Sequence, residues 1–202
     1  MAQAARRRDG HLARERMLEE AMTAIAESGL AALTMSALAR RLGTSGGHIL
    51  YYFGSKDRLL AEALRWSESG LTEERAALLT RRVTAHRKLE LFVDLYLPRG
   101  PRDPRWTLWI ELWARTAANA ELREAQDELD RGWQRDLAAL LTKGAAQGRF
   151  AVPASEAEAR AVELLALLDG LSTRVLLAGP EADTAWARKS ALAAAARLIP
   201  HT

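Results

Sequence analysis

The sequence predicts an all-α protein, on two observations. Ala, Leu, Arg and Glu dominate its 202 residues, and no stretch shows the alternation of β-branched and polar residues that a strand requires. Proline and glycine are concentrated at breaks over residues 97–105, 147–153 and 178–183, and the stretches between them carry apolar residues at helical spacing. We therefore expect about nine helices, in an N-terminal three-helix unit and a larger C-terminal helical unit.

The first part of the chain predicts three short helices and the start of a fourth. The first covers 12–28 and ends at Gly29, a residue favoured directly after a helix C-terminus. Each later helix is preceded by a hydroxyl side chain that can cap exposed backbone N–H groups. These caps are Thr34 for the helix through Leu42, Ser45 for the helix to about Tyr52, and Ser55 for the fourth helix. Beyond them, we expect helices at about 80–97, 105–117, 119–147, 155–178 and 183–199.

The second and third predicted helices are separated by the short corner Gly43-Thr44, which is the arrangement of a helix-turn-helix. Leu38 and Ile49 are apolar where they can fix the crossing angle, and Ala39 is small where the two helices approach. In such a unit the third helix enters the DNA major groove, which admits one helix. Residues 43–47 also match the G-x-S-x-G motif of α/β-hydrolases, but that motif follows a strand, and none is predicted here. We therefore expect DNA as the partner.

The expected DNA contacts lie on and around the third helix. Gly46 and Gly47 cost helix propensity, about 1 kcal/mol each, but they remove side chains where backbone amides can approach a phosphate. Alternatively, the pair only loosens the turn. His48 can donate to a base or a phosphate, and Lys56 at a helix N-terminus is either a phosphate clamp or a solvated lysine. The predicted set is Thr34, Ser36, Ser45, Gly46, Gly47, His48, Tyr51, Tyr52 and Lys56.

The charge distribution agrees with a DNA partner. Residues 1–60 hold nine basic and six acidic residues, so the whole formal excess of +3 lies beside the predicted helix-turn-helix. A basic footprint at that place favours attraction to phosphates.

Residues 12–62 resemble the N-terminal domain of the TetR family of bacterial transcriptional regulators. The resemblance rests on the helix ending at Gly29 and on the segments LTMSALARRLGTSGG (33–47) and YYFGSKDRLL (51–60). It implies a DNA-binding domain over 10–62, an effector-binding and dimerisation domain over 63–202, and a two-fold dimer that most often represses. Leu50 stands where the family usually has a tyrosine, and Tyr51 or Tyr52 is expected to supply the missing phosphate contact. The C-terminal half, at WTLWIELW (106–113) and LLDGL (167–171), resembles more loosely the branch of the family that contains BetI.

The C-terminal residues predict a ligand pocket and a dimer interface. Aromatic side chains at helical spacing can line a cavity between helices or simply form core. The candidates for the effector pocket are Trp66, Phe92, Tyr96, Trp109, Trp113 and Trp133. The last two helices are apolar around more than half of their circumference, which favours a four-helix dimer interface over central helices of a monomer. Its candidates are Leu164, Leu168, Leu171, Val175, Trp186, Leu192 and Ala195.

The composition argues against several other classes of protein. Cysteine is absent, which excludes disulfides and thiolate metal sites, and the four histidines are scattered. We expect no enzymatic activity, no metal and no cofactor. No apolar run approaches the roughly 18 residues of a membrane span, so we expect a cytoplasmic protein.

The leading hypothesis is a dimeric, ligand-responsive repressor that reads a palindromic operator through residues 45–52 and is released by a small-molecule effector. An activator is the alternative within this class. An all-helical carrier or enzyme with a structural N-terminal unit, or a helical protein-interaction module, are the alternatives outside it.

Overall fold

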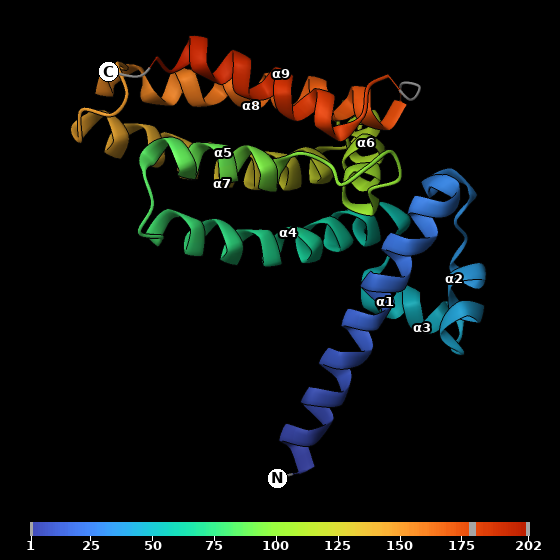
Figure 1. Ribbon diagram of the computed structural model, residues 1–202. Helices are drawn as coiled ribbons and strands as arrows, with labels where there is room; N and C mark the ends of the chain where they lie inside the picture. Colours follow the sequence, from blue (N-terminus) through green and yellow to red (C-terminus); the bar gives the residue numbers. More distant parts are fainter. Residues whose placement is uncertain (1, 178–180, 201–202) are drawn as a thin grey trace. The chain divides into compact units, whose positions relative to one another are not determined.

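The computed structural model describes the backbone of residues 2–177 and 181–200 and side chains from residue 13 onward (Figure 1). Over these residues the chain folds into nine α-helices and one short 3₁₀ helix, which confirms the all-α prediction. The helices are α1 Ala2–Ala32, α2 Met35–Leu42, α3 Gly46–Phe53, α4 Lys56–Thr80, α5 Ala85–Tyr96, α6 Pro104–Thr116, α7 Ala120–Ala146, α8 Ala157–Leu177 and α9 Thr184–Leu198, with η1 at Ala154–Glu156.

Most predicted helix bounds agree with the structure to within two residues. The largest difference is at α1, which begins at Ala2, ten residues before the predicted start at residue 12, and the next largest is at the start of α5. The predicted helix at 80–97 begins at Ala85, because the hydroxyl of Thr84 accepts a hydrogen bond from the backbone N–H of Arg87 and caps the helix there. Residue 178, the predicted last residue of α8, lies outside the described residues.

The first compact unit contains the described residues up to Glu68 together with Pro104–Gln126. Gly29 has φ +77°, so the regular part of α1 ends there, as the sequence predicts. The next backbone N–H, that of Leu30, donates to Oε1 of Glu111 at 2.8 Å, which attaches the end of α1 to α6. Fully buried apolar side chains fill the core of this unit. They include Leu18, Ile25, Leu38, Ile49, Leu59, Leu60 and Leu64.

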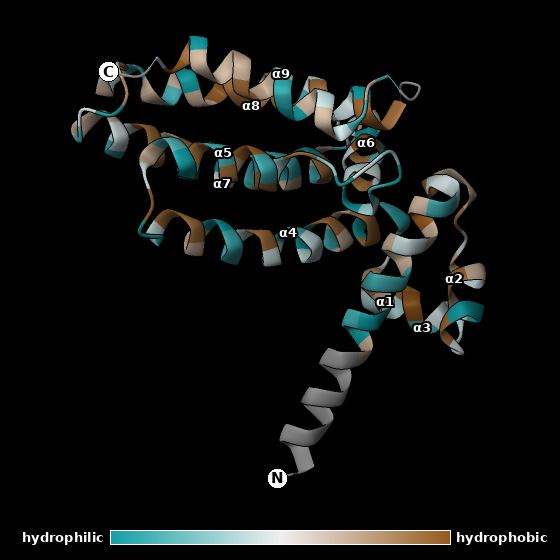
Figure 2. Cartoon of the chain, in the orientation of Figure 1, coloured by the Kyte–Doolittle hydropathy of each residue, from teal (hydrophilic) through white to brown (hydrophobic). Residues whose placement is uncertain are grey.

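The second compact unit contains Ser69–Asp103 and the described residues from Asp127 onward. Within it α8 and α9 run side by side (Figure 1). The side of α9 that packs inward carries small residues, namely Ala187, Ala191, Ala194 and Ala195, all buried. Small side chains let two helix backbones approach closely, and both helices also carry hydrophilic residues along their lengths (Figure 2).

Two helices contribute residues to both compact units. Residues 56–68 of α4 belong to the first unit and its remaining residues to the second, and α7 is divided in the same way after Gln126. The predicted functional boundary at residue 62 remains a prediction.

None of the helices in the described part of the chain has the length and apolar character needed to cross a lipid bilayer.

Candidate functional site

The corner joining α2 to α3 is built from caps that the sequence predicts. Oγ1 of Thr34 accepts from the N–H of Ala37 at 3.0 Å at the start of α2. Gly43 then takes a left-handed conformation, φ +65°, and its N–H bonds back to α2. The hydroxyl of Ser45 accepts from the N–H of His48 at 3.2 Å and starts α3. These local hydrogen bonds fix where α2 begins and ends and where α3 begins.

Ion pairs and one lysine hold the helix-turn-helix on α1. Arg41 of α2 pairs with Glu20 and Glu27 of α1, and its hydrogen bond lowers the pKa of the Glu27 carboxyl. Nζ of Lys56 donates to the carbonyl oxygen of Ala31 at 3.3 Å, at the end of α1. Without DNA this lysine therefore contacts the end of α1, and its role as a phosphate clamp remains a prediction.

The outer face of α3 presents most of the predicted DNA contacts. Tyr51 is 83% exposed, on the side of the helix opposite the buried Ile49 and Phe53. The ring of Tyr52 lies 5.2 Å from that of His48 and 5.7 Å from that of Tyr51 between ring centroids, so these three side chains form one cluster. Thr34, Ser36, Ser45 and Gly47 are also exposed, whereas Gly46, Tyr52 and Lys56 are half-buried.

Nothing in the described part of the chain requires glycine at positions 46 and 47. Neither residue has a positive φ. A Cβ at Gly46 would lie 3.6 Å from backbone atoms of α2, and a Cβ at Gly47 would meet only Oγ of Ser45 at 4.0 Å. Both distances are ordinary contacts. The helix propensity lost at these two positions therefore has no internal compensation, which favours an approaching partner as the reason for the glycines.

Three of the predicted effector-pocket residues, Trp66, Trp109 and Trp113, lie in the first unit. The rings of Trp109 and Trp113 are 5.8 Å apart between centroids. Nε1–H of Trp109 donates to Oε1 of the buried Glu68 at 2.8 Å, and Arg105 pairs with the same oxygen at 3.4 Å. Trp66 is half-buried. Trp109 and Glu68 thus form part of the interior of the first unit.

The other three, Phe92, Tyr96 and Trp133, lie together in the second unit. The ring of Trp133 lies edge-on to Tyr96 at 4.7 Å and to Phe92 at 5.4 Å between centroids. All three side chains are buried. The O–H of Tyr96 donates to Oδ1 of Asp169 on α8. We call these three rings the aromatic cage.

Asp169 is a half-buried carboxyl with a raised pKa. Burial raises its pKa to about 6, the hydrogen bond from Tyr96 acts in the opposite direction, and the nearby Asp130 adds to the rise. Removal from water disfavours the ionised form, and this effect outweighs the hydrogen bond that favours it.

The predicted dimer-interface residues divide by burial. Leu164, Leu168, Leu171, Val175 and Ala195 pack inside the second unit, Leu192 is half-buried, and Trp186 is 37% exposed. Side chains packed into the core of one chain are not available for contact with a second copy. Apolar periodicity in the sequence marks a face that is buried, but it does not say whether the same chain or a second copy covers that face. The outward side of α8 instead presents Val162 and Leu177, which are 48% and 70% exposed.

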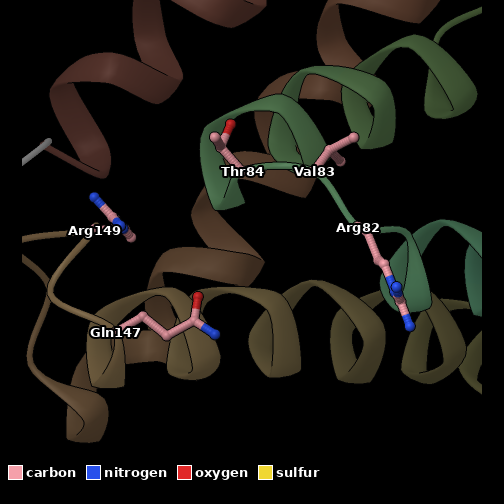
Figure 3. Close-up of a pocket in the computed structure, with 5 residues that line it drawn as sticks. All are labelled: Arg82, Val83, Thr84, Gln147 and Arg149. Carbon is pink, nitrogen blue, oxygen red and sulfur yellow. The ribbon is translucent and has the colours of Figure 1, made fainter.

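A shallow hollow in the second unit has a different lining. It lies where the connection from α4 to α5 passes the end of α7 and is lined by Arg82, Val83, Thr84, Gln147 and Arg149. Figure 3 shows Arg82 extending away from the other four residues, so the two guanidinium groups do not converge. The hydroxyl of Thr84 is already used as the cap of α5. None of the predicted pocket residues lines this hollow.

Among the residues whose side chains the structure describes, no cluster of His, Asp or Glu could hold a metal ion.

Comparison with known protein families accounts for both halves of the chain. The sequence model for bacterial regulatory proteins of the tetR family matches residues 17–63. The model for the C-terminal region of BetI-type transcriptional repressors matches residues 85–200, more than half of the chain. This chain belongs to the TetR family of transcriptional regulators.

Individual transcriptional regulators are similar over nearly the full chain. The HTH-type transcriptional regulator BetI of Burkholderia ambifaria is 30% identical over 183 residues, covering 88% of this chain and 89% of that protein. A regulator from Saccharomonospora viridis, solved in complex with choline, is 29% identical with a TM-score of 0.85, covering 94% of this chain and 98% of that one. A regulator from Rhodococcus sp. Rha1 is 25% identical with a TM-score of 0.73, covering 92% and 97%.

The family assignment confirms the predicted function class, a DNA-binding transcriptional regulator with a helix-turn-helix. A carrier or enzyme with a purely structural N-terminal unit would not account for the match over residues 17–63. The departure at Leu50, which the sequence already marked, lies on α3 with its side chain 44% exposed. Arg75, which is buried against Trp133, was not predicted, because nothing in the sequence separates it from the other arginines.

Replacement of Gly47 by Ala should change folding and DNA binding in opposite directions. Because the site has room for a Cβ, Gly47→Ala should raise the free energy of unfolding by about 0.5–1 kcal/mol. The added methyl should weaken DNA binding severalfold where the helix start approaches a phosphate. Urea unfolding and fluorescence anisotropy with labelled DNA measure the two effects. Gly70→Ala in α4, where a Cβ meets nothing within 4 Å, is the control that should stabilise without changing DNA affinity. Unchanged DNA affinity in Gly47→Ala would show that the glycines only loosen the turn.

Replacement of Asp169 by Asn should flatten the dependence of stability on pH. The folded-state pKa of about 6 lies above the ordinary value of 3.8, so the folded protein binds more protons between these pH values. Wild-type stability should therefore fall as pH rises from about 4 to 6, by up to roughly 3 kcal/mol. Asn still accepts the hydrogen bond from Tyr96 and carries no charge, so the variant should lack this fall. Urea unfolding from pH 4 to 7.5 measures it, with the exposed Asp127→Asn as control. Parallel curves for wild type and Asp169→Asn would contradict the assignment.

Proposed function

We propose that this TetR-family regulator is a cytoplasmic, dimeric repressor that reads a palindromic operator through α3 and is released by a small organic cation held at the aromatic cage. The observation that supports it most is the outer face of α3. A capped helix of a helix-turn-helix presents an 83% exposed tyrosine to solvent and starts with two glycines that the fold does not require. Such a helix suits the major groove and its flanking phosphates.

The distribution of exposed apolar side chains supports a dimer. Among the described residues, six large hydrophobic side chains are exposed. Two of them, Leu50 and Tyr51, lie on α3, and three lie on α8 and α9 or at their ends, namely Val162, Leu177 and Trp186. An outward apolar surface on the last two helices fits contact with a second copy. Two reading helices related by two-fold symmetry would contact half-sites whose centres lie roughly 34–36 Å apart, or a multiple of that.

The chemistry of the second unit supports a cationic effector. Three aromatic rings and the carboxyl of Asp169 lie together in the cage. Aromatic faces with adjacent carboxylates are the usual surroundings of bound quaternary ammonium groups. The similar regulator from Saccharomonospora viridis was solved in complex with choline, a cation of this kind. A ligand releases DNA only if it binds the released state more tightly than the DNA-bound one.

Selection of bound sequences from a pool of random DNA duplexes tests the operator part of the proposal. Wild-type protein should enrich an inverted repeat, and binding to it should weaken steeply with salt because phosphate contacts release counterions. Tyr51→Ala should lose at least tenfold in affinity for that sequence, and Val83→Ala, an exposed apolar side chain away from α3, should lose nothing. In a transcription assay the protein should lower output from a promoter that overlaps the site.

Three outcomes would contradict the proposal separately. Enrichment of no sequence would contradict operator recognition, and enrichment of a site without internal symmetry would contradict the dimer. Transcription raised by bound protein would make the regulator an activator.

A further inference from the structure

The second unit encloses a positive charge of its own beside the aromatic cage. Arg75, on the part of α4 that belongs to this unit, is 3% exposed. Its Nε donates to Oδ2 of Asp136 on α7 at 2.7 Å, and its Nη2 donates to Oγ1 of Thr72 at 3.1 Å. A buried guanidinium is expensive unless it is paired, and Asp136 provides the pairing.

The same guanidinium lies over the face of the cage tryptophan. Cζ of Arg75 is 4.0 Å from the centroid of the Trp133 ring. This is well inside the distance of about 6 Å at which cation–π attraction is significant. Trp133 is also the ring that contacts both Tyr96 and Phe92. Arg75 thus occupies the position against Trp133 that a bound organic cation would take.

One carboxylate contacts this guanidinium, and two more lie on the Tyr96 side of the cage. Asp136 holds Arg75, Asp169 holds Tyr96, and Asp130 lies near enough to Asp169 to affect its ionisation. The buried amine of Lys88 donates to the carbonyl oxygen of Leu79 at the end of α4, at 2.6 Å. An arrangement of acidic groups and aromatic faces favours a cation over a neutral molecule or an anion.

We propose that the guanidinium of Arg75 fills the cation-binding position of the aromatic cage. An organic cation acts on this protein by competing with that guanidinium for Trp133 and Asp136. This inference rests on the proposed cationic effector and adds how the site is controlled. A site that is filled by its own side chain binds a ligand more weakly, in proportion to the fraction of molecules in which it is free. When the ligand enters, Arg75 leaves Asp136, and the C-terminal half of α4 loses that attachment to α7.

The competing ligand should be a small cation with a delocalised or shielded charge. Methylguanidinium reproduces the group that it displaces, and tetramethylammonium presents a charge covered by methyl groups. Both charges are more easily removed from water than that of a simple ammonium. Tert-butanol has a similar apolar surface without charge and should not compete.

Calorimetric titration of the full chain at constant ionic strength tests the competition. Arg75→Ala should bind tetramethylammonium and methylguanidinium at least tenfold more tightly than the wild type, and should not bind tert-butanol measurably. Arg75→Lys should lie between the two, since an ammonium group can still occupy the site. Trp133→Leu added to Arg75→Ala should remove the gain.

Equal cation affinities for wild type and Arg75→Ala would overturn the proposal, and so would a gain that tert-butanol shares. If Arg75→Ala does not fold, Arg75→Met keeps the apolar stem without the charge. Methylguanidinium should then raise the melting temperature of the Met variant more than that of wild type, and an equal rise in both would overturn the inference.

DNA release measured on the same proteins separates this inference from the proposed function. Tight cation binding to Arg75→Ala without any effect on operator binding would support the occupied cage and contradict the cationic effector. Release of operator by cations that bind wild type and Arg75→Ala equally would support the effector and contradict the competition.

Discussion

One long helix supplies a charged side chain to the contacts within each compact unit. α4 runs from Lys56 to Thr80 and contributes to both compact units. In the first unit its Asp57 accepts hydrogen bonds from Arg115 at 3.3 Å and from Asn119 at 3.0 Å, which attaches the helix start to α6 and to the residue before α7. In the second unit its Arg75 pairs with Asp136 of α7. Under the proposed competition, a ligand that breaks the second attachment would act on the helix that directly follows α3 in the chain.

The two compact units use charge in different ways. In the first unit, the ion pairs of Arg41 on α2 with Glu20 and Glu27 on α1 are exposed to solvent, so they orient the helices and add little stability. In the second unit the guanidinium of Arg75 is buried, where both pairing and loss of pairing have larger consequences. The raised pKa of Asp169 reflects the same low-dielectric surroundings. A cation arriving beside this carboxyl would favour its ionised form, so ligand binding and proton release would be linked.

Local signals made the N-terminal unit predictable, whereas the ligand cage depends on tertiary contacts. The caps Thr34 and Ser45 and the left-handed Gly43 act within a few residues, and the structure confirms each of them. The pairing of Arg75 with Trp133 joins residues 58 positions apart on different helices, and no local pattern marks it. Leu164 and Leu168 show a related limit. Their apolar spacing predicted burial, but it could not distinguish packing within the chain from packing against a second copy.

The most direct test of the account is the thermodynamic coupling between operator and cation. Operator affinity would be measured by fluorescence anisotropy with and without saturating tetramethylammonium, at ionic strength matched with NaCl, and cation affinity with and without operator. Because binding linkage is reciprocal, the account predicts that each ligand weakens the other by the same factor, at least fivefold. Operator affinity that does not change with the cation at matched ionic strength would contradict it.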